Sequence, residues 1–529
     1  MAEQREQILA RGSYFPGDWV RPRYNPGTWM AMVDLAEIFT GHRSITSQGT
    51  YEMFDAPIGV NLRVEAADKS EPFLTPEKEW EAEDIAYPGY IWHEDGRLHM
   101  LYNVGETTCL AVSDDGYNWE RPVLGQTEFN GSTDNNMLKT SLQASIFEDP
   151  SAPPEERYKA LEAKGFWLDR ETGEEVDSEE ADRCWRAEHY EGRSYSGRKV
   201  VLKGQLLGLT SPDRLTWTRL PEPLANYSVN GGICPGYDVH NGVYYAYIQP
   251  QGVAPEEPQA LGASMPETEV FRRAIGLTRT KDFRKWPAAK LLIYPDAQDP
   301  LDISFYGACY FPYPGRDELH AMVIPVFHNA TDHVDLQLAF SRDGLIWTRP
   351  ERSAAAELGP LGSGEEGQIH VWRNGLVELP DGNWAVPYHA RSTLHTVKDE
   401  YKAAFFPEMQ ASQNRWARWR PHRLCGVEAE TEGRFTIPTV FRQENELRLN
   451  YRCAPGGWIR VELMARIPTM QCPDANPLEG FTFEMCDLLT GDQEDQVVTW
   501  QGSSDITDVG EMLAIRVKMF QAKLFAYKV

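Results

Sequence analysis

The chain has 529 residues, of which 41% are hydrophobic and 25% charged, a composition typical of a folded protein with room for more than one domain. A formal net charge of −27 disfavours broad binding to nucleic acid or to anionic membrane surfaces, and favours a small neutral ligand. There is no apolar signal segment at the start and no apolar run long enough to span a bilayer, so we expect a cytoplasmic protein.

The distribution of cysteine and histidine predicts neither a metal site nor a cofactor. The eight cysteines are scattered without Cys-x-x-Cys pairs, which disfavours a zinc site and a dense disulfide framework. The sequence contains no His-x-x-x-His pair and no EF-hand loop. We therefore expect the cysteines to be buried free thiols.

A short pattern that recurs five times predicts the fold. In its best copies an apolar strand ends at a serine, a turn containing Asp and Gly follows, and a tryptophan opens the next strand. The copies lie at residues 113–122, 211–220, 280–287, 341–350 and 414–421. Such a unit cannot bury its own apolar face, so five units predict blades arranged around an axis, that is, a five-bladed β-propeller.

In chain order, the sequence divides into three parts. Residues 1–75 are expected as an N-terminal lead-in packed on the propeller, residues 76–427 as the propeller, and residues 428–529 as a C-terminal β-sandwich. Residues 168–200 are polar and charged, which is typical of a surface loop. Blade strands are expected at residues 87–93, 98–104, 108–113, 142–147, 157–163, 205–210, 233–239, 243–249, 274–278, 306–313, 319–327, 334–340, 369–379 and 384–389. The predicted fold class is therefore all-β.

Several runs between residue 55 and the end of the chain carry a family resemblance. They include Ser-Asp-Asp-Gly at 113–116, Pro-Pro-Glu-Glu-Arg-Tyr-Lys-Ala at 153–160, Leu-Gln-Leu-Ala-Phe-Ser-Arg-Asp-Gly at 336–344 and Gly-Gly at 456–457. In these runs the chain resembles bacterial proteins described as similar to glycoside hydrolase family 32. The resemblance implies a five-bladed propeller with a C-terminal β-sandwich, among the propeller glycosidases that include invertases, fructosidases and arabinofuranosidases. The family motifs Asn-Asp-Pro-Asn-Gly, Arg-Asp-Pro and Glu-Cys are absent at suitable blades, so fructose specificity does not carry over.

The catalytic candidates are acidic residues just before inner strands. The inner strand of each blade lines the central funnel, and glycoside hydrolysis needs two carboxyl groups that face one bond. Asp84 precedes the first blade and Asp302 the fourth, while Glu365 and Glu366 precede the fifth, after the glycine-rich residues 362–364. For each acid, the alternative is a solvated turn residue. Which of them is acid, base or nucleophile stays open.

Polar and aromatic residues near the funnel are candidates for binding the sugar. Side chains at strand ends can bond to hydroxyl groups and rings can stack on a sugar, although packing in the core is the alternative for each. The candidates are Glu83, Trp92, Gln143, Asn230, Tyr306, His328, Asn329, Trp372, His389 and Arg391. The repeated Asp114, Asp213 and Asp343 lie in outer hairpin turns and are expected to be structural.

These predictions favour an enzyme, a glycoside hydrolase that removes a terminal sugar, a furanoside among the candidates, from a small oligosaccharide or glycoside. The fold also suits a glycoside phosphorylase or transglycosidase, and a non-catalytic carbohydrate-binding propeller. A cluster of arginine, lysine and histidine beside the funnel would favour phosphate. The expected partner is a small carbohydrate, with no nucleic acid and no membrane, and a homo-oligomer is left open.

Overall fold

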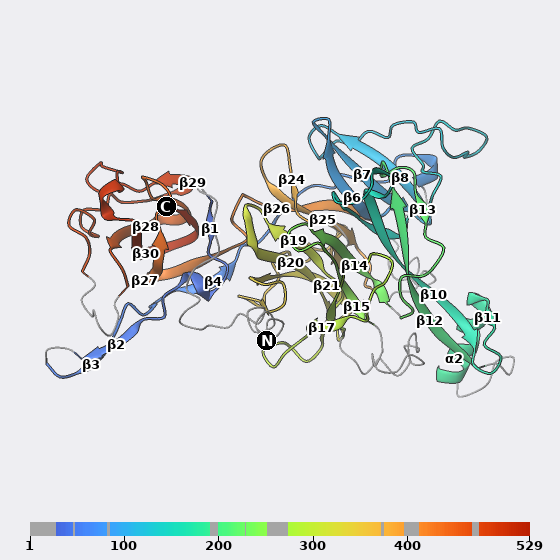
Figure 1. Cartoon of the computed structure of the whole chain (residues 1–529), viewed down its shortest axis with the longest axis horizontal. Coiled ribbons are helices and arrows are strands. Elements are labelled where there is room, and N and C mark those ends of the chain that lie inside the picture. Colours follow the sequence, from blue (N-terminus) through green and yellow to red (C-terminus); the bar gives the residue numbers. More distant parts are fainter. Residues whose placement is uncertain are drawn as a thin grey trace.

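The computed structural model shows a chain built mainly of β-strands, in two bodies that lie side by side (Figure 1). It describes residues 28–45, 48–81, 85–190, 199–227, 229–250, 273–371, 375–395, 412–467 and 476–529. The predicted five-bladed β-propeller followed by a β-sandwich is confirmed. In these ranges no helix has the length and apolar character needed to cross a membrane.

The first three blades are antiparallel meanders. Blade one contains β6 (Ile85–Glu94), β7 (Arg97–Val104) and β8 (Thr107–Ser113); blade two contains β9 (Ala144–Glu148), β10 (Tyr158–Asp169), β12 (Val200–Ser211) and β13 (Thr218–Arg219); blade three contains β14 (Val229–Asp238), β15 (Val243–Pro250), β16 (Ile275–Thr280) and β17 (Lys290–Ile293). Successive side chains of a strand point to opposite faces. Ile146 of β9 therefore packs with blade one and Phe147 with blade three, which explains why this strand is apolar at consecutive positions.

Blades four and five complete the ring. Blade four contains β18 (Ile303–Phe305), β19 (Cys309–Tyr313), β20 (Arg316–His328), β21 (His333–Ser341) and β22 (Trp347–Thr348); blade five contains β23 (Gln368–His370), β24 (Val377–Glu378), β25 (Trp384–Arg391), β26 (Gln413–Trp419) and β5 (Asp68–Lys69). β5 comes from ahead of blade one and pairs with β26. A strand that precedes blade one in the sequence therefore pairs with the last strand of the propeller, and this pairing in blade five closes the ring.

The recurring sequence pattern forms the outer hairpin turns of blades one to four, whereas its fifth copy, at 414–421, lies largely within strand β26. In blade four, Oγ of Ser341 accepts a hydrogen bond from the N–H of Gly344 at 2.9 Å. The carboxylate of Asp343 accepts from the two N–H groups that follow Gly344, both at 2.8 Å. Gly344 has a φ of +68°, and its carbonyl accepts from the indole of Trp347 at 3.2 Å. The Ser, Asp, Gly and Trp of the pattern therefore each form a hydrogen bond within the turn.

Asp114 lies in the outer hairpin turn of blade one as expected, but the aspartate that accepts the turn's N–H bonds is its neighbour Asp115. Oδ1 of Asp115 accepts from two backbone N–H groups at 2.8 Å each. Burial opposes ionisation, but these bonds outweigh it and lower the pKa of Asp115 to about 2. Asp114 instead forms an ion pair with Arg97 at 2.6 Å. Asp213 and Asp343 hold their turns as expected.

A long arm extends from blade two, where a surface loop was predicted. β10 and β12 pair without interruption from Tyr158 and Ser211 out to Asp169 and Val200, and Figure 1 shows them projecting from the propeller. At the tip, β11 (Glu175–Val176) pairs with β10, and α2 (Ser178–Tyr190) packs against both long strands. Buried Val176, Ala181, Cys184 and Val200 form a small core there. In the sequence these four residues are separated by charged residues, so the amphipathic pattern of the helix was not recognised.

The second body is the β-sandwich, built on three long strands. β27 (Cys425–Phe441), β30 (Met512–Lys528) and β28 (Arg448–Met464) lie side by side, with β29 (Asp492–Val497) beyond β28 and β4 (Asn61–Val64) beyond β27. Bulges interrupt the pairing of β27 and β28 with β30, and such bulges bend strands. The strands enclose a core that includes Phe435, Ile459, Ile515 and Trp500.

The chain before blade one contributes strands to both bodies. β4 and β1 (Met30–Ala31) pair with the sandwich, whereas β5 belongs to blade five. Glu65, between β4 and β5, pairs with Lys523 of the sandwich at 2.9 Å. β2 (His42–Ile45) and β3 (Tyr51–Phe54) form a separate hairpin that projects from the sandwich (Figure 1). Short 3-10 helices lie at Leu35–Glu37 (η1), Glu79–Glu81 (η2), Pro154–Glu156 (η3) and Thr507–Val509 (η6).

Candidate functional site

The inner strands of blades four and five bring the candidate acids to one end of the propeller. The first residue of β18 pairs with His328, the last residue of β20, so Asp302 lies directly before that pair. β23 begins at Gln368, two residues after Glu366. Val334, near the start of β21, pairs with Gln368. The two strand starts therefore lie close together at this end, although more than 60 residues separate Asp302 from Glu366 in the sequence.

His328 lies within the influence of two aspartates. Its Nε2 is 2.8 Å from Oδ2 of Asp335 on the neighbouring strand β21, and Asp302 adds a second negative charge. Asn329 contacts residues on both sides of Ile303. Its backbone N–H donates to the carbonyl of Asp302 at 2.7 Å, and its side-chain amide donates to Oγ of Ser304 at 3.1 Å. Three predicted site residues, Asp302, His328 and Asn329, are thus neighbours.

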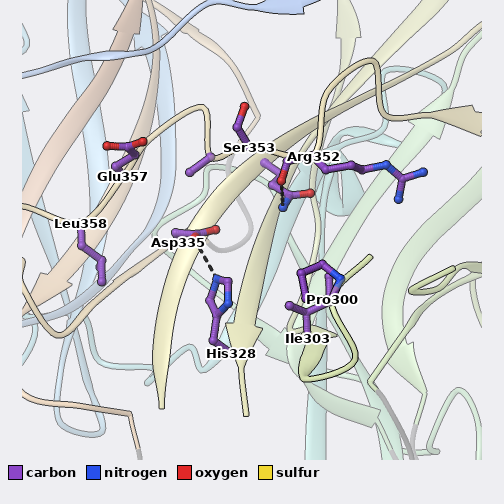
Figure 2. Close-up of a pocket in the computed structure, with 10 residues that line it drawn as sticks. Pro300, Ile303, His328, Asp335, Arg352, Ser353, Glu357 and Leu358 are labelled. Atoms are coloured by element: carbon purple, nitrogen blue, oxygen red, sulfur yellow. Dashed lines mark hydrogen bonds and ion pairs between the residues drawn. The ribbon is translucent and has the colours of Figure 1, made fainter. Parts of the chain in front are cut away.

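A cleft of about 460 Å³ opens beside this group. Figure 2 shows His328 and Asp335 joined in the cleft, with Arg352 and Glu357 on opposite sides of the pair. Apolar groups, among them Ile303, also line it. A concave space lined by both polar and apolar groups can hold a small molecule.

We expect the pKa of His328 to lie above the ordinary value of 6.5, and Asp335→Asn to lower it. The hydrogen bond to Asp335 is the largest cause of the rise, and the charges of Asp335 and Asp302 add to it, while burial opposes it. Because the folded protein holds this proton more tightly than the unfolded chain, the stabilisation is complete below pH 6.5 and is lost as pH rises through the folded pKa. Imidazole NMR titration measures both values; an unchanged pKa in Asp335→Asn would refute the contact.

The two neighbouring glutamates before blade five have different surroundings. Glu365 is buried, and its carboxylate binds Nζ of Lys69 and the hydroxyl of Tyr388, both at 2.7 Å. Glu366 is half-buried and accepts from the N–H groups of Gly362 at 3.1 Å and Gly364 at 2.8 Å. These contacts support a structural role for Glu365 and leave Glu366 as the more accessible carboxylate.

Imidazole and aromatic rings form a second group at this end of the propeller. The ring of Tyr306, which follows β18, meets His370 at a centroid distance of 5.1 Å and His395 at 4.7 Å. His395 also meets Phe327 at 5.2 Å. The guanidinium of Arg273 lies over Tyr306 at 4.8 Å and over Phe327 at 5.2 Å, as in cation–π contacts. We call these five residues the Arg–His cluster.

His389 and Arg391 lie at the same end of β25. Nε of Arg391 donates to Nε2 of His389 at 3.1 Å. Burial, followed by the charge of Arg391, lowers the pKa of His389 to about 3, so the imidazole is neutral and can accept this bond. His389 therefore orients Arg391 rather than carrying charge itself.

Two other predicted binding residues have packing roles in the structure. The ring of Trp92 stacks on Tyr90 at 5.6 Å and on His99 at 5.2 Å, and it is buried. The side chain of Gln143 donates to the carbonyl of Gly105 at 3.0 Å. These contacts lie within and between blades one and two.

The remaining predicted residues fall outside what can be described. Asn230 is part of β14, but its side chain is not among those described. Glu83, Asp84 and Trp372 lie outside the described residues altogether.

Several residues of the site escaped prediction from sequence. Asp335 lies near the start of β21, and pairing β20 with β21 around the turn at 329–332 would have placed it opposite Val326, on the same face as His328. Arg273, His370 and His395 show no periodic pattern that separates them from packing residues. Only the arrangement of the blades brings them together.

No family model matches the chain, and no curated protein matches it. Among solved structures, it is similar to a thermostable family-43 glycoside hydrolase, at 13% identity and a TM-score of 0.38, over 63% of this chain and 88% of that chain. It is similar to an N-acetylgalactosamine deacetylase from F. plautii, at 13% identity and a TM-score of 0.36, over 68% of this chain and 95% of that chain. It is also similar to a sucrose-6-phosphate hydrolase from Lactobacillus gasseri, at 10% identity and a TM-score of 0.32, over 85% of this chain and 93% of that chain.

Proposed function

We propose that the chain is a glycoside hydrolase that cleaves a terminal sugar, a furanoside among the candidates, from a small oligosaccharide or glycoside. The observation that carries the proposal is the group of Asp302, His328 and Asp335 beside a cleft of about 460 Å³. Cleavage of a glycosidic bond needs carboxyl groups next to a space for one sugar ring and polar groups that orient its hydroxyls.

Asp302 and Glu366 are the proposed carboxyl pair, with Asp84 of blade one as the third candidate. One carboxyl group protonates the departing oxygen, and the other acts as a base on water or as the nucleophile at the anomeric carbon. His328 contacts Asp335 at 2.8 Å and lies within the electrostatic influence of Asp302. His328 is thus a positioning residue in this proposal.

The test is hydrolysis of a panel of nitrophenyl glycosides, including arabinofuranosides, by the full chain and by the variants Asp84→Asn, Asp302→Asn, Glu365→Gln and Glu366→Gln. Loss of turnover in Asp302→Asn and Glu366→Gln supports the proposed pair. Full activity in both Asp302→Asn and Glu366→Gln would overturn it. Sugar binding without turnover by the unmodified chain would instead support a non-catalytic carbohydrate-binding propeller.

A further inference from the structure

Arg273 gives the Arg–His cluster a positive charge that recognition of neutral hydroxyl groups does not need. Within the residues that the structure describes, no carboxylate lies at ion-pair distance from Arg273. By contrast, Arg349 and Arg352, beside the cleft, are both bonded to Asp299. Arg273 instead lies over the rings of Tyr306 and Phe327, which attract a cation but leave its N–H groups directed to other partners.

Burial is the main cause of the lowered pKa values of the two histidines next to Arg273. Burial lowers the pKa of His395, and the charges of Arg273 and Arg391 lower it further, against the opposing charge of Asp332. Burial likewise lowers the pKa of His370 well below its usual range, and His395, His389 and Arg391 act in the same direction. Burial therefore favours the neutral form of both imidazoles.

The cluster also contains a hydrogen-bonding group that the described chain does not use. Nδ1 of His395 is buried and has no hydrogen-bond partner among the described residues. A neutral imidazole can present an N–H at that position. An oxyanion could accept from it while receiving charge-assisted bonds from a guanidinium, which presents several N–H donors in a fixed plane.

We propose that the Arg–His cluster binds a phosphate oxyanion next to the sugar site, with Arg273 as its principal charged contact and His395 as a neutral donor. The ligand is either free inorganic phosphate or the phosphoryl group of a phosphorylated sugar, since both present the same oxygens. The inference rests on the proposed function, because it names a charged part of the ligand bound beside Asp302. It is a binding proposal and requires no covalent step.

The experiment is isothermal titration of the full chain with inorganic phosphate, with a hexose 6-phosphate and with the same hexose unphosphorylated. We expect saturable binding of at least one phosphate-bearing probe, tighter than the neutral hexose. Arg273→Ala should weaken it about tenfold or more, the effect of losing a charge-assisted hydrogen bond, and Arg273→Lys should weaken it less. Arg43→Ala is the matched control, because Arg43 also lies over a tyrosine ring, Tyr51, but on the distant β2–β3 hairpin.

The two phosphate probes separate the possible sources. Binding of inorganic phosphate identifies a free-phosphate site, and binding of the hexose phosphate alone identifies a phosphorylated substrate. The absence of binding by both, or binding unchanged in Arg273→Ala, overturns the proposal. Asp302→Asn should keep phosphate binding even if hydrolysis is lost. The oxyanion site and the hydrolase proposal can therefore fail independently of each other.

Discussion

Replacing Asp302 with asparagine is expected to lower kcat/KM for the best glycoside of the panel by about a thousandfold, within the range that a positioned acid or base contributes. The substitution keeps the shape of the side chain but removes the charge and the proton. The backbone carbonyl of Asp302, which accepts from Asn329, is unaffected. The thermal unfolding temperature should therefore stay close to that of the unmodified chain, so that lost activity reports chemistry.

Asp317→Asn provides the control for this variant. Asp317 lies at the other end of β20, with an 82% exposed side chain and a 3.6 Å approach to His240. Its replacement should change kcat/KM by less than about twofold, because exposed ion pairs contribute little. An Asp302→Asn variant with the activity of Asp317→Asn would exclude Asp302 from the catalytic pair.

The architecture could be predicted from sequence because its repeat is local. The turn at 341–347 satisfies its own bonds within seven residues, and the same residue types recur in the other blades. A local motif of this kind marks where the outer hairpins of blades one to four lie, whereas the fifth copy lies within strand β26. The arm at 158–211 could not be found in that way, because its small core depends on residues separated by a polar tip.

The site could be predicted only in part. Residues just before inner strands are recognisable once the blades are assigned, and this reasoning placed Asp302 beside His328. It could not separate Glu365 from Glu366, which are adjacent in sequence. Their difference arises from Lys69, almost 300 residues away, whose strand β5 joins blade five from ahead of blade one. Contacts of that range follow from ring closure and leave no mark in a local pattern.

Replacing Asp299 with alanine is expected to lower the free energy of unfolding of the propeller by about 3–5 kcal/mol, the typical cost of leaving a buried charge without its partner. The side chain of Asp299 is fully buried. Its carboxylate is bonded to Arg349 at 2.7 Å and Arg352 at 2.9 Å, and it accepts from the N–H of Asp296 at 2.8 Å. Alanine leaves the guanidinium of Arg349, which is only 4% exposed, without this carboxylate. Urea denaturation at neutral pH measures the change.

Asp296→Ala is the matched control, because Asp296 contacts the same two arginines from a side chain that is 46% exposed. We expect it to cost less than about 1 kcal/mol, since water screens the exposed pair. Lowering the pH should also reduce the difference in the free energy of unfolding between Asp299→Ala and the unmodified chain. Burial opposes ionisation of Asp299, but the bond from Arg349 and the other bonds lower its pKa below 3.8, so its stabilisation is present above that pH and is lost as pH falls through the folded pKa. Equal costs for the two variants at neutral pH would show that burial of Asp299 does not decide the strength of this network.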